Sequence, residues 1–239
     1  MATLDLEKGG AGDAAFADGI VRAGFIKKTF GLLCAQLALT TVLAGAIVFN
    51  AAVRAVVVEG SVIPLIAMFG SLGLILALSF SEHCRNSHPT NLILMAAFTV
   101  CESVIVGMAA SRYDTMVVIT AFGMTAAVSA GLAVYAQRTK NDFTAIGGFL
   151  HAMLMSLILA TILAAVFHVP MLSLGISLGG AALFSLYLIH DIQMIVGGAH
   201  HQFKFGPDDY VIASIQCYLD IINLFLHLLR ILSELNRNS

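Results

Sequence analysis

Long stretches without a charged side chain divide this sequence and restrict its fold more than any other feature. Residues 29–53, 60–81 and 143–190 contain no Asp, Glu, Lys or Arg. A helix needs about 20 apolar residues to cross the hydrocarbon core of a bilayer, because each residue advances the helix by about 1.5 Å. Each of the first two stretches can therefore form one crossing, and the third, at 48 residues, is long enough for two.

The composition agrees with a membrane protein. Hydrophobic residues make up 59% of the 239 residues, charged residues only 11%, and the mean hydropathy is +0.93. These values lie far from the balance of a soluble domain. The sequence has a net charge of −2 and no basic stripe that would bind nucleic acid. We therefore predict an all-α integral membrane protein whose main partner is the lipid bilayer.

We predict a bundle of seven transmembrane helices. They are expected at about residues 29–49, 60–81, 91–110, 115–136, 144–167 and 171–196, with a last helix from after Asp209 to about Leu229. Pro64 suits the first turn of the second helix, and Pro170 should separate the fifth helix from the sixth. Residues 1–28 are then expected to form a short cytosolic arm, residues 29–232 the membrane domain and residues 233–239 a short polar tail.

Lysine and arginine are unevenly distributed between the two sides of this bundle. Eight belong to the N-terminal arm and the loops on its side, namely Lys8, Arg22, Lys27, Lys28, Arg85, Arg138, Lys140 and Lys204. The loops on the opposite side contain only Arg54 and Arg112. Because cytosolic loops are enriched in Lys and Arg, we predict a cytosolic N-terminus. Seven full crossings would place Arg230 and Arg237 on the other side, so a last segment that re-enters the membrane and returns stays open as an alternative.

Two aspartates lie within the last two predicted helices. Asp191 should lie about 9 Å from the end of its helix and Asp220 about 16 Å from the start of the next, at about 1.5 Å per residue. A charged carboxylate inside a membrane costs at least about 2–3 kcal/mol and usually faces a partner or a wet cavity. The short connection makes the two helices antiparallel neighbours, so the two carboxyl groups can meet. Such a pair suggests proton sensing or cation handling.

Three further polar residues are candidates for the same site. Glu102 lies in the middle of the third predicted helix, where a carboxylate is costly, and we expect it to line or gate an ion path. Asn223 follows Asp220 by three residues, so it shares a helix face with Asp220 and can extend a polar network. Arg85 is expected to anchor the cytosolic end of the second helix, with its charged group reaching the interface.

The segment from Tyr218 to Arg230, which reads YLDIINLFLHLLR, is the most specific of several motifs in the chain. It resembles the closing signature of the transmembrane Bax inhibitor motif family, and most of all its Golgi anti-apoptotic (lifeguard) branch. His190-Asp191-Ile192-Gln193 resembles the sixth-helix motif, which normally reads aromatic-Asp-Thr-Gln, so His190 and Ile192 depart from the pattern. Further similar segments are Phe25-Ile26-Lys27-Lys28, Arg85 with His88-Pro89 and Asn91, Gln137-Arg138-Thr139-Lys140-Asn141-Asp142-Phe143, and Gly206-Pro207-Asp208-Asp209-Tyr210.

This resemblance implies a seven-helix bundle that leaks Ca²⁺ in a pH-sensitive way and restrains cell death, in the Golgi or the endoplasmic reticulum. On that pattern Asp191 and Asp220 form the pH-sensing pair and bind Ca²⁺ transiently, and Arg85 is a latch partner of Asp191. Like charges a few Å apart do not easily both ionise, so the pair is expected to share one proton. Loss of this proton would separate the helices and expose oxygen ligands of the kind that Ca²⁺ prefers. No cofactor is expected.

Two other classes of function also fit a membrane bundle with two aspartates. Intramembrane aspartyl proteases typically carry Tyr-Asp on one helix and Gly-x-Gly-Asp on the next, whereas this chain has His190-Asp191 and Tyr218-Leu219-Asp220. We therefore expect no enzymatic activity. A non-conducting adaptor that binds apoptotic or channel proteins, with purely structural aspartates, stays open as the alternative to a leak. A flux assay on the purified, reconstituted protein separates the two.

Overall fold

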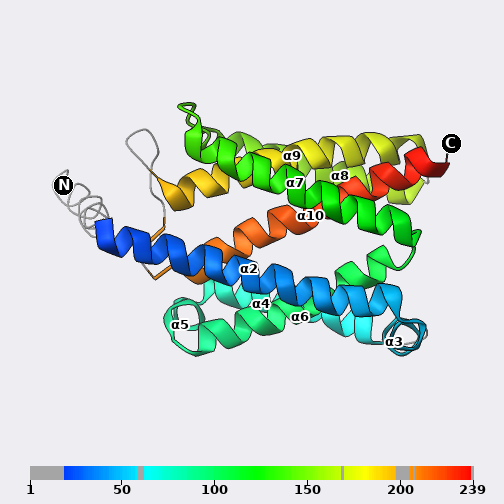
Figure 1. Cartoon of the computed structure of the whole chain (residues 1–239), viewed down its shortest axis with the longest axis horizontal. Coiled ribbons are helices and arrows are strands. Elements are labelled where there is room, and N and C mark those ends of the chain that lie inside the picture. Colours follow the sequence, from blue (N-terminus) through cyan, green and yellow to red (C-terminus); the bar gives the residue numbers. More distant parts are fainter. Residues whose placement is uncertain (1–18, 59–61, 168–169, 198–204, 207, 238–239) are drawn as a thin grey trace.

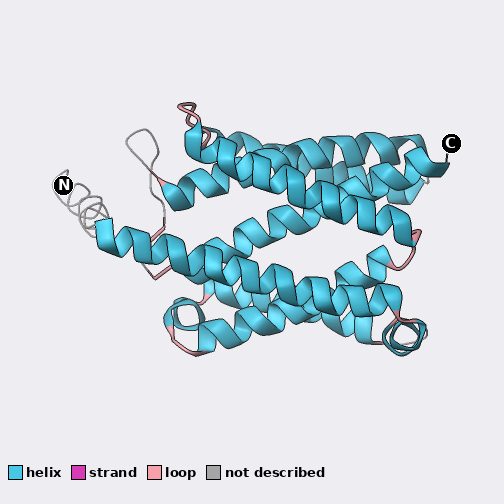
Figure 2. Ribbon diagram, viewed as in Figure 1, coloured by secondary structure: helices cyan, strands magenta, loops and turns pink. Residues whose placement is uncertain are grey.

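The computed structural model describes residues 19–58, 62–167, 170–197, 205–206 and 208–237. Over these residues the chain consists of helices joined by short loops, without a strand (Figure 2). Seven of the helices are long and apolar enough to cross a membrane. This confirms the predicted all-α membrane fold with seven spanning helices.

The elements follow one another along the chain as Figure 1 labels them. They are α2 (Gly19–Phe49), α3 (Ala51–Val57), α4 (Ile63–Phe80), α5 (Glu82–Asn86), α6 (Thr90–Ala110), α7 (Thr115–Arg138), the 3₁₀ turn η1 (Thr144–Ile146), α8 (Gly147–Phe167), α9 (Pro170–Val196) and α10 (Tyr210–Arg237). The short helices α3 and α5 were not predicted. Asn50 caps α3, because its side-chain oxygen accepts hydrogen bonds from the backbone N–H groups of Ala52 and Val53.

The first and last spanning helices are longer than the sequence predicted. α2 begins at Gly19, so it includes ten residues that we had expected in the N-terminal arm; residues 1–18 lie outside the described part. These turns of α2 are held by the bundle: the Phe25 side chain is buried, and the Arg22 guanidinium donates a hydrogen bond to the carbonyl of Val196. α10 continues to Arg237 and includes most of the expected polar tail.

α10 is the central helix of the bundle. It packs against α9, α7, α2 and α6, and Figure 1 shows it crossing between a layer formed by α7, α8 and α9 and a layer formed by α2, α4 and α6. In its most apolar window 56% of the residues are buried, compared with 6% for α8, which packs along α9 at the periphery. The helix that carries Asp220 is therefore the one best shielded from lipid.

α10 is one continuous helix, and this tests the alternative in which the last segment re-enters the membrane and returns to the same side. Its 28 residues form one helix about 42 Å long at about 1.5 Å per residue, more than the hydrocarbon thickness of about 30 Å. Its end lies at the opposite end of the bundle from the start of α2 (Figure 1). A segment that re-entered and returned would need a break in the helix, so the structure favours a full seventh crossing.

Candidate functional site

Asp191 in α9 and Asp220 in α10 lie close together inside the bundle. The two helices pack side by side, and Asp191 lies within side-chain hydrogen-bonding reach of Asp220. Both residues are buried, with exposed fractions of 7% and 5%. The depths estimated from the sequence differed by about one helical turn, within the error of boundaries predicted from sequence, and the packing of α9 against α10 brings the two side chains together. Their functional role stays a prediction.

His190 is a direct neighbour of this pair. Its Nδ1 lies 2.6 Å from Oδ1 of Asp191, and both side chains are buried. The other ring nitrogen, Nε2, faces Gly147 at the start of α8, where an added Cβ would lie only 2.9 Å away. The sequence showed His190 as a departure from the family motif, and the structure shows that the departure adds a third polar group to the site.

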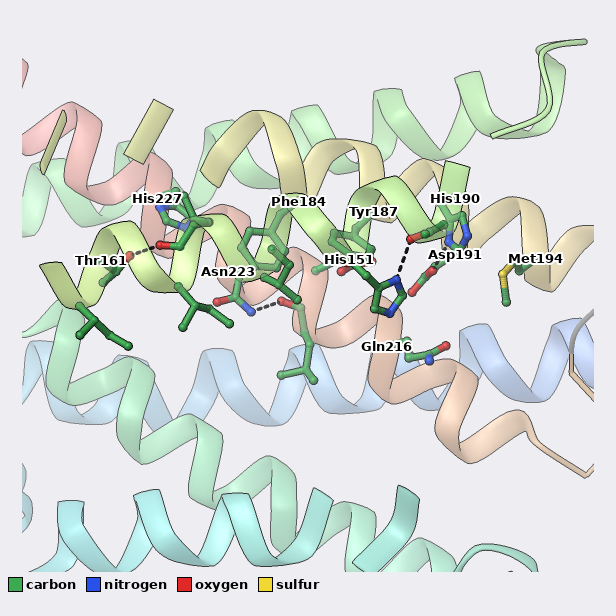
Figure 3. Close-up of a pocket in the computed structure, with 18 residues that line it drawn as sticks. His151, Thr161, Phe184, Tyr187, His190, Asp191, Met194, Gln216, Asn223 and His227 are labelled. Carbon is green, nitrogen blue, oxygen red and sulfur yellow. Dashed lines mark hydrogen bonds and ion pairs between the residues drawn. The ribbon is translucent and has the colours of Figure 1, made fainter. Parts of the chain in front are cut away.

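The aspartate pair lines a cavity of about 790 Å³ formed by α8, α9 and α10. In Figure 3 the labelled side chains follow one another from Gln216 and Asp191 at one end to Thr161 and His227 at the other. Three buried polar atoms of the lining have no hydrogen-bonding partner among the described residues: Oδ2 of Asp220, Nε2 of His190 and the hydroxyl of Tyr187. Buried polar groups normally have partners, so water or an ion is needed to complete the site.

Asn223 lies where the sequence placed it, on the Asp220 face of α10 and in the lining of the same cavity. Its side-chain amide donates a 2.8 Å hydrogen bond to the carbonyl of Leu219, one turn back in its own helix. Asn223 thus adds a polar side chain to the cavity that holds the pair, and its part in a network stays a prediction.

Arg85 does not reach Asp191. In the described part of the chain its charged partner is Asp209, with 3.5 Å between Nε of Arg85 and Oδ1 of Asp209. Asp209 precedes α10 and also accepts a 2.8 Å hydrogen bond from the backbone N–H of Gly206. Arg85 lies in α5, outside the spanning helices, whereas Asp191 is in the interior. The latch that the resemblance implied is therefore replaced in this structure by an ion pair at the end of the bundle.

Glu102 is not part of the cavity that holds the aspartate pair. It lies on α6 facing α4, where the hydroxyl of Ser71 donates a hydrogen bond to its Oε1. The expected polar network around Glu102 therefore exists, but it joins α4 to α6. The expectation that Glu102 lines or gates the ion path stays a prediction, and Glu102 lies outside the lining of the cavity that holds the aspartates.

Two structural polar groups were not recognised from the sequence. The side chain of Gln193 accepts a hydrogen bond from the N–H of Phe143 at 2.8 Å and donates to the carbonyls of Asn141 and Ala136 at 2.9 and 3.3 Å. It thereby holds the loop after α7 against α9. The hydroxyls of Thr40 and Tyr218 lie 2.8 Å apart and join α2 to α10. The only sequence signal was that Gln193 and residues 137–143 both belong to family-like motifs.

A bound metal is not indicated by the side chains of the described residues. No group of three or more His, Cys, Asp or Glu side chains among them is arranged to hold an ion. Two carboxyl groups and a histidine in a cavity suit a transient encounter with a cation better than a permanent site, because Ca²⁺ takes six to eight oxygen ligands in stable sites.

Comparison with known proteins agrees with the motifs. Residues 22–238 match the family model described as "Inhibitor of apoptosis-promoting Bax1". The chain belongs to the Bax inhibitor family. Protein lifeguard 4 of Mus musculus is 39% identical over 217 residues, which cover 91% of this chain and 87% of that protein. The Golgi anti-apoptotic protein of Vaccinia virus (strain Lister) is 37% identical over 217 residues, with 91% and 88% covered.

The family also includes more distant relatives of this chain. A BI1-like protein of Arabidopsis thaliana is 33% identical over 241 residues, which cover 97% of this chain and 90% of that protein. The matched region contains the whole of α4 to α10 and nearly all of α2. The resemblance inferred from the closing motif on α10 is thereby confirmed for the entire membrane bundle.

Proposed function

We propose that this member of the Bax inhibitor family is a pH-sensitive Ca²⁺ leak channel of endomembranes, which lowers stored Ca²⁺ and thereby restrains cell death. One observation carries the proposal: two buried carboxyl groups, Asp191 and Asp220, lie within hydrogen-bonding reach of each other in a cavity of about 790 Å³ inside a membrane bundle. Carboxylates at such positions usually mark an ion or proton pathway.

The chemistry of the pair suggests how pH controls the leak. When the two carboxyl groups share one proton, the hydrogen bond between them holds α9 and α10 together. Loss of that proton leaves two like charges, whose repulsion separates the helices and frees oxygen ligands for Ca²⁺. The leak should therefore increase as the pH rises. The other titratable groups that face the pair are His190, His151, Tyr187 and Cys217.

Relatives and charge distribution support the cellular setting that we propose. One relative is named Golgi anti-apoptotic protein, and another is named protein lifeguard 4. Golgi or endoplasmic reticulum membranes are therefore the proposed location. The excess of Lys and Arg on the side of the N-terminus supports a cytosolic N-terminus. Ca²⁺ and protons are the proposed cargo and signal, and apoptotic or channel proteins are the proposed protein partners.

Ca²⁺ flux through the purified protein in liposomes tests this function. Asp220→Asn nearly preserves the shape of the side chain and removes one charge, so the like-charge repulsion disappears. We expect Asp220→Asn and Asp191→Asn each to abolish most of the pH response of the Ca²⁺ leak. The double variant should add little, because residues of one coupled site are not additive. An indicator dye inside the liposomes reports the leak over a series of pH values.

Each result of this assay has a defined meaning. Additive effects of the two substitutions, or an unchanged pH profile in both variants, would show that the pair is not the sensor. A folded wild-type protein that carries no Ca²⁺ would overturn the leak and favour the non-conducting adaptor. The expectation that the protein has neither a cofactor nor an enzymatic activity stays a prediction.

A further inference from the structure

A stripe of polar side chains runs along one face of α10. It consists of Gln216, Asp220, Asn223, His227, Arg230 and Glu234, which follow one another at spacings of four, three, four, three and four residues. This spacing places them on one side of a helix with 3.6 residues per turn. From first to last the stripe covers about 27 Å at about 1.5 Å per residue, close to the hydrocarbon thickness of about 30 Å.

The surroundings of the stripe differ from one end to the other. Its first four residues line the cavity of about 790 Å³, and the last two continue toward the end of α10, where Arg230 is exposed and Glu234 is half-buried. The opposite wall of the cavity is α8, which packs along α9 and makes little contact with α10 in the described part. The space between α8 and α10 is therefore open along the first four residues of the stripe.

The inner end of this space contains buried polar atoms without hydrogen-bonding partners in the described residues. Oδ2 of Asp220, Nε2 of His190 and the hydroxyl of Tyr187 are buried there without partners among the described residues. Each of these three side chains is more than nine-tenths buried and lines the cavity. An unpaired polar group inside a bilayer costs several kcal/mol, so a continuous polar face next to an open space is expected to be hydrated.

The other side of the bundle has a cavity with a different lining in the described residues. This cavity of about 570 Å³ lies between α2, α6, α7 and α10, and its polar side chains are hydroxyl groups, with no carboxyl group or histidine. They belong to Thr40, Thr41, Thr125 and Ser129. Glu102 is engaged by Ser71 between α4 and α6. The cavity along the stripe is the one whose described lining combines carboxyl groups with histidines and amides.

We infer that the space between α8 and α10 is the hydrated route by which cations reach Asp191 and Asp220, with Asn223 and His227 as polar contacts on the way. The route leads from the pair toward the end of the bundle where α10 ends. This inference deepens the proposed function and rests on it only for the identity of the ion as Ca²⁺.

The ring of His227 has a fixed place along this route. It stacks on Phe184 of α9, with 5.7 Å between the ring centroids and 24° between the planes. It also lies over Gly180, where an added Cβ would overlap the ring. A glycine at that position lets the imidazole lie between α9 and α10 with one edge on the cavity.

Cysteine accessibility in the full-length protein tests the route without measuring flux. The starting variant has Cys34, Cys84 and Cys101 replaced by serine and keeps Cys217, which is fully buried. Single cysteines are introduced as Asn223→Cys and Gln216→Cys on the stripe. The matched controls are Ile119→Cys on α7, which lines the cavity of about 570 Å³ and is 49% exposed, and Ser71→Cys beside Glu102. A membrane-impermeant cationic thiol reagent is added to each side of the liposomes in turn.

We expect both stripe cysteines to react at least about tenfold faster than Ile119→Cys, and Asn223→Cys to do so with the reagent acting from the side on which α10 ends. Ca²⁺ should slow the reaction of Asn223→Cys, and Asp220→Asn in the same chain should remove this protection. Reaction of both stripe cysteines as slow as at Ile119→Cys would overturn the route. So would Ca²⁺-sensitive reaction at Ser71→Cys alone, which would move the path to α4 and α6.

The two proposals can fail separately. Fast, Ca²⁺-protected reaction at Asn223→Cys in a protein without Ca²⁺ flux would support the hydrated route and overturn the leak. Normal Ca²⁺ flux with unreactive stripe cysteines would support the leak and overturn the route. Fast reaction that Ca²⁺ does not slow would show that the space is hydrated, and it would overturn the inference that cations pass along the stripe.

Discussion

Among single residues, a comparison of Glu102 with Asp220 shows how much the position of a carboxylate in the sequence leaves undecided. Glu102 and Asp220 both lie in the middle of a spanning helix, and both are costly there. Asp220 faces a second carboxyl group in a cavity, whereas Glu102 accepts a hydrogen bond from Ser71 between two packed helices. The same residue class therefore belongs to the candidate site in one case and to helix packing in the other.

This difference predicts a mild phenotype for Glu102→Gln. A glutamine side-chain oxygen can still accept the hydrogen bond from Ser71, so Ca²⁺ flux and its pH response should stay close to wild type. Glu102→Leu leaves the buried Ser71 hydroxyl without this acceptor and should lower the free energy of unfolding by about 1–3 kcal/mol. Flux in liposomes and unfolding in detergent measure the two effects. A large loss of flux in a well-folded Glu102→Gln protein would return Glu102 to the ion path.

Among helices, α9 connects the site to the loop on its own end of the bundle. Asp191 and Gln193 lie two residues apart on α9: the first faces Asp220, and the second makes two hydrogen bonds to the loop between α7 and η1 and one to the last turn of α7. α9 ends at Val196 and is followed by Gly197, whose φ of 57° is readily adopted only by glycine, and whose N–H donates to the carbonyl of Gln193. The position of α9, and hence of Asp191, depends on these contacts.

Replacement of Gln193 by leucine should loosen this end of α9. Gln193→Leu leaves the N–H of Phe143 and the carbonyl of Asn141 without their partners, which should cost about 2–4 kcal/mol of unfolding free energy. Trypsin should also cleave faster after Arg138 and Lys140 in the released loop. Gln137→Leu, at an exposed position near the end of α7, is the control and should behave like wild type. Equal stability of both variants would show that the loop is held by other contacts.

For the whole molecule, the number of crossings decides which side each terminus faces. α10 is one continuous helix, and its end lies opposite the start of α2 (Figure 1). Seven crossings then place the two termini on different sides, even though Arg230 and Arg237 follow the last crossing on the side that is poor in Lys and Arg. With these two arginines the side opposite the N-terminus has four Lys and Arg residues, still fewer than the eight on the side of the N-terminus, so the charge distribution keeps its direction.

Labelling of single cysteines on intact membranes tests this topology. Ala2→Cys and Asn141→Cys should react with an impermeant reagent from the same side, the cytosol, because four spanning helices, α2, α4, α6 and α7, lie between them in the sequence. Ser239→Cys should react only from the opposite side. Reaction of Ala2→Cys and Asn141→Cys from different sides would refute the topology, and reaction of Ser239→Cys from the cytosol would restore the re-entrant last segment.

The sequence by itself determined the membrane class, the number of spanning helices and most of their ends. A charge-free stretch of membrane length predicts a helix, because the backbone N–H and C=O groups of a helix form their hydrogen bonds within the same segment and none is left unpaired in lipid. The sequence also identified Asp191 and Asp220, because a carboxylate in such a stretch is conspicuous, and the family, because the closing motif on α10 is specific. These features are local, so they can be read one segment at a time.

Only the tertiary structure decided which polar groups meet. Most of the spanning helices are apolar on all sides, so their sequences hardly specify which face turns inward or which neighbour it packs against. The pairing of Arg85 with Asp209, the place of Glu102 between α4 and α6, and the contact of His190 with Asp191 all depend on that rotation and packing. The cavity beside α10 exists for the same reason: α8 packs along α9 and leaves the polar face of α10 uncovered.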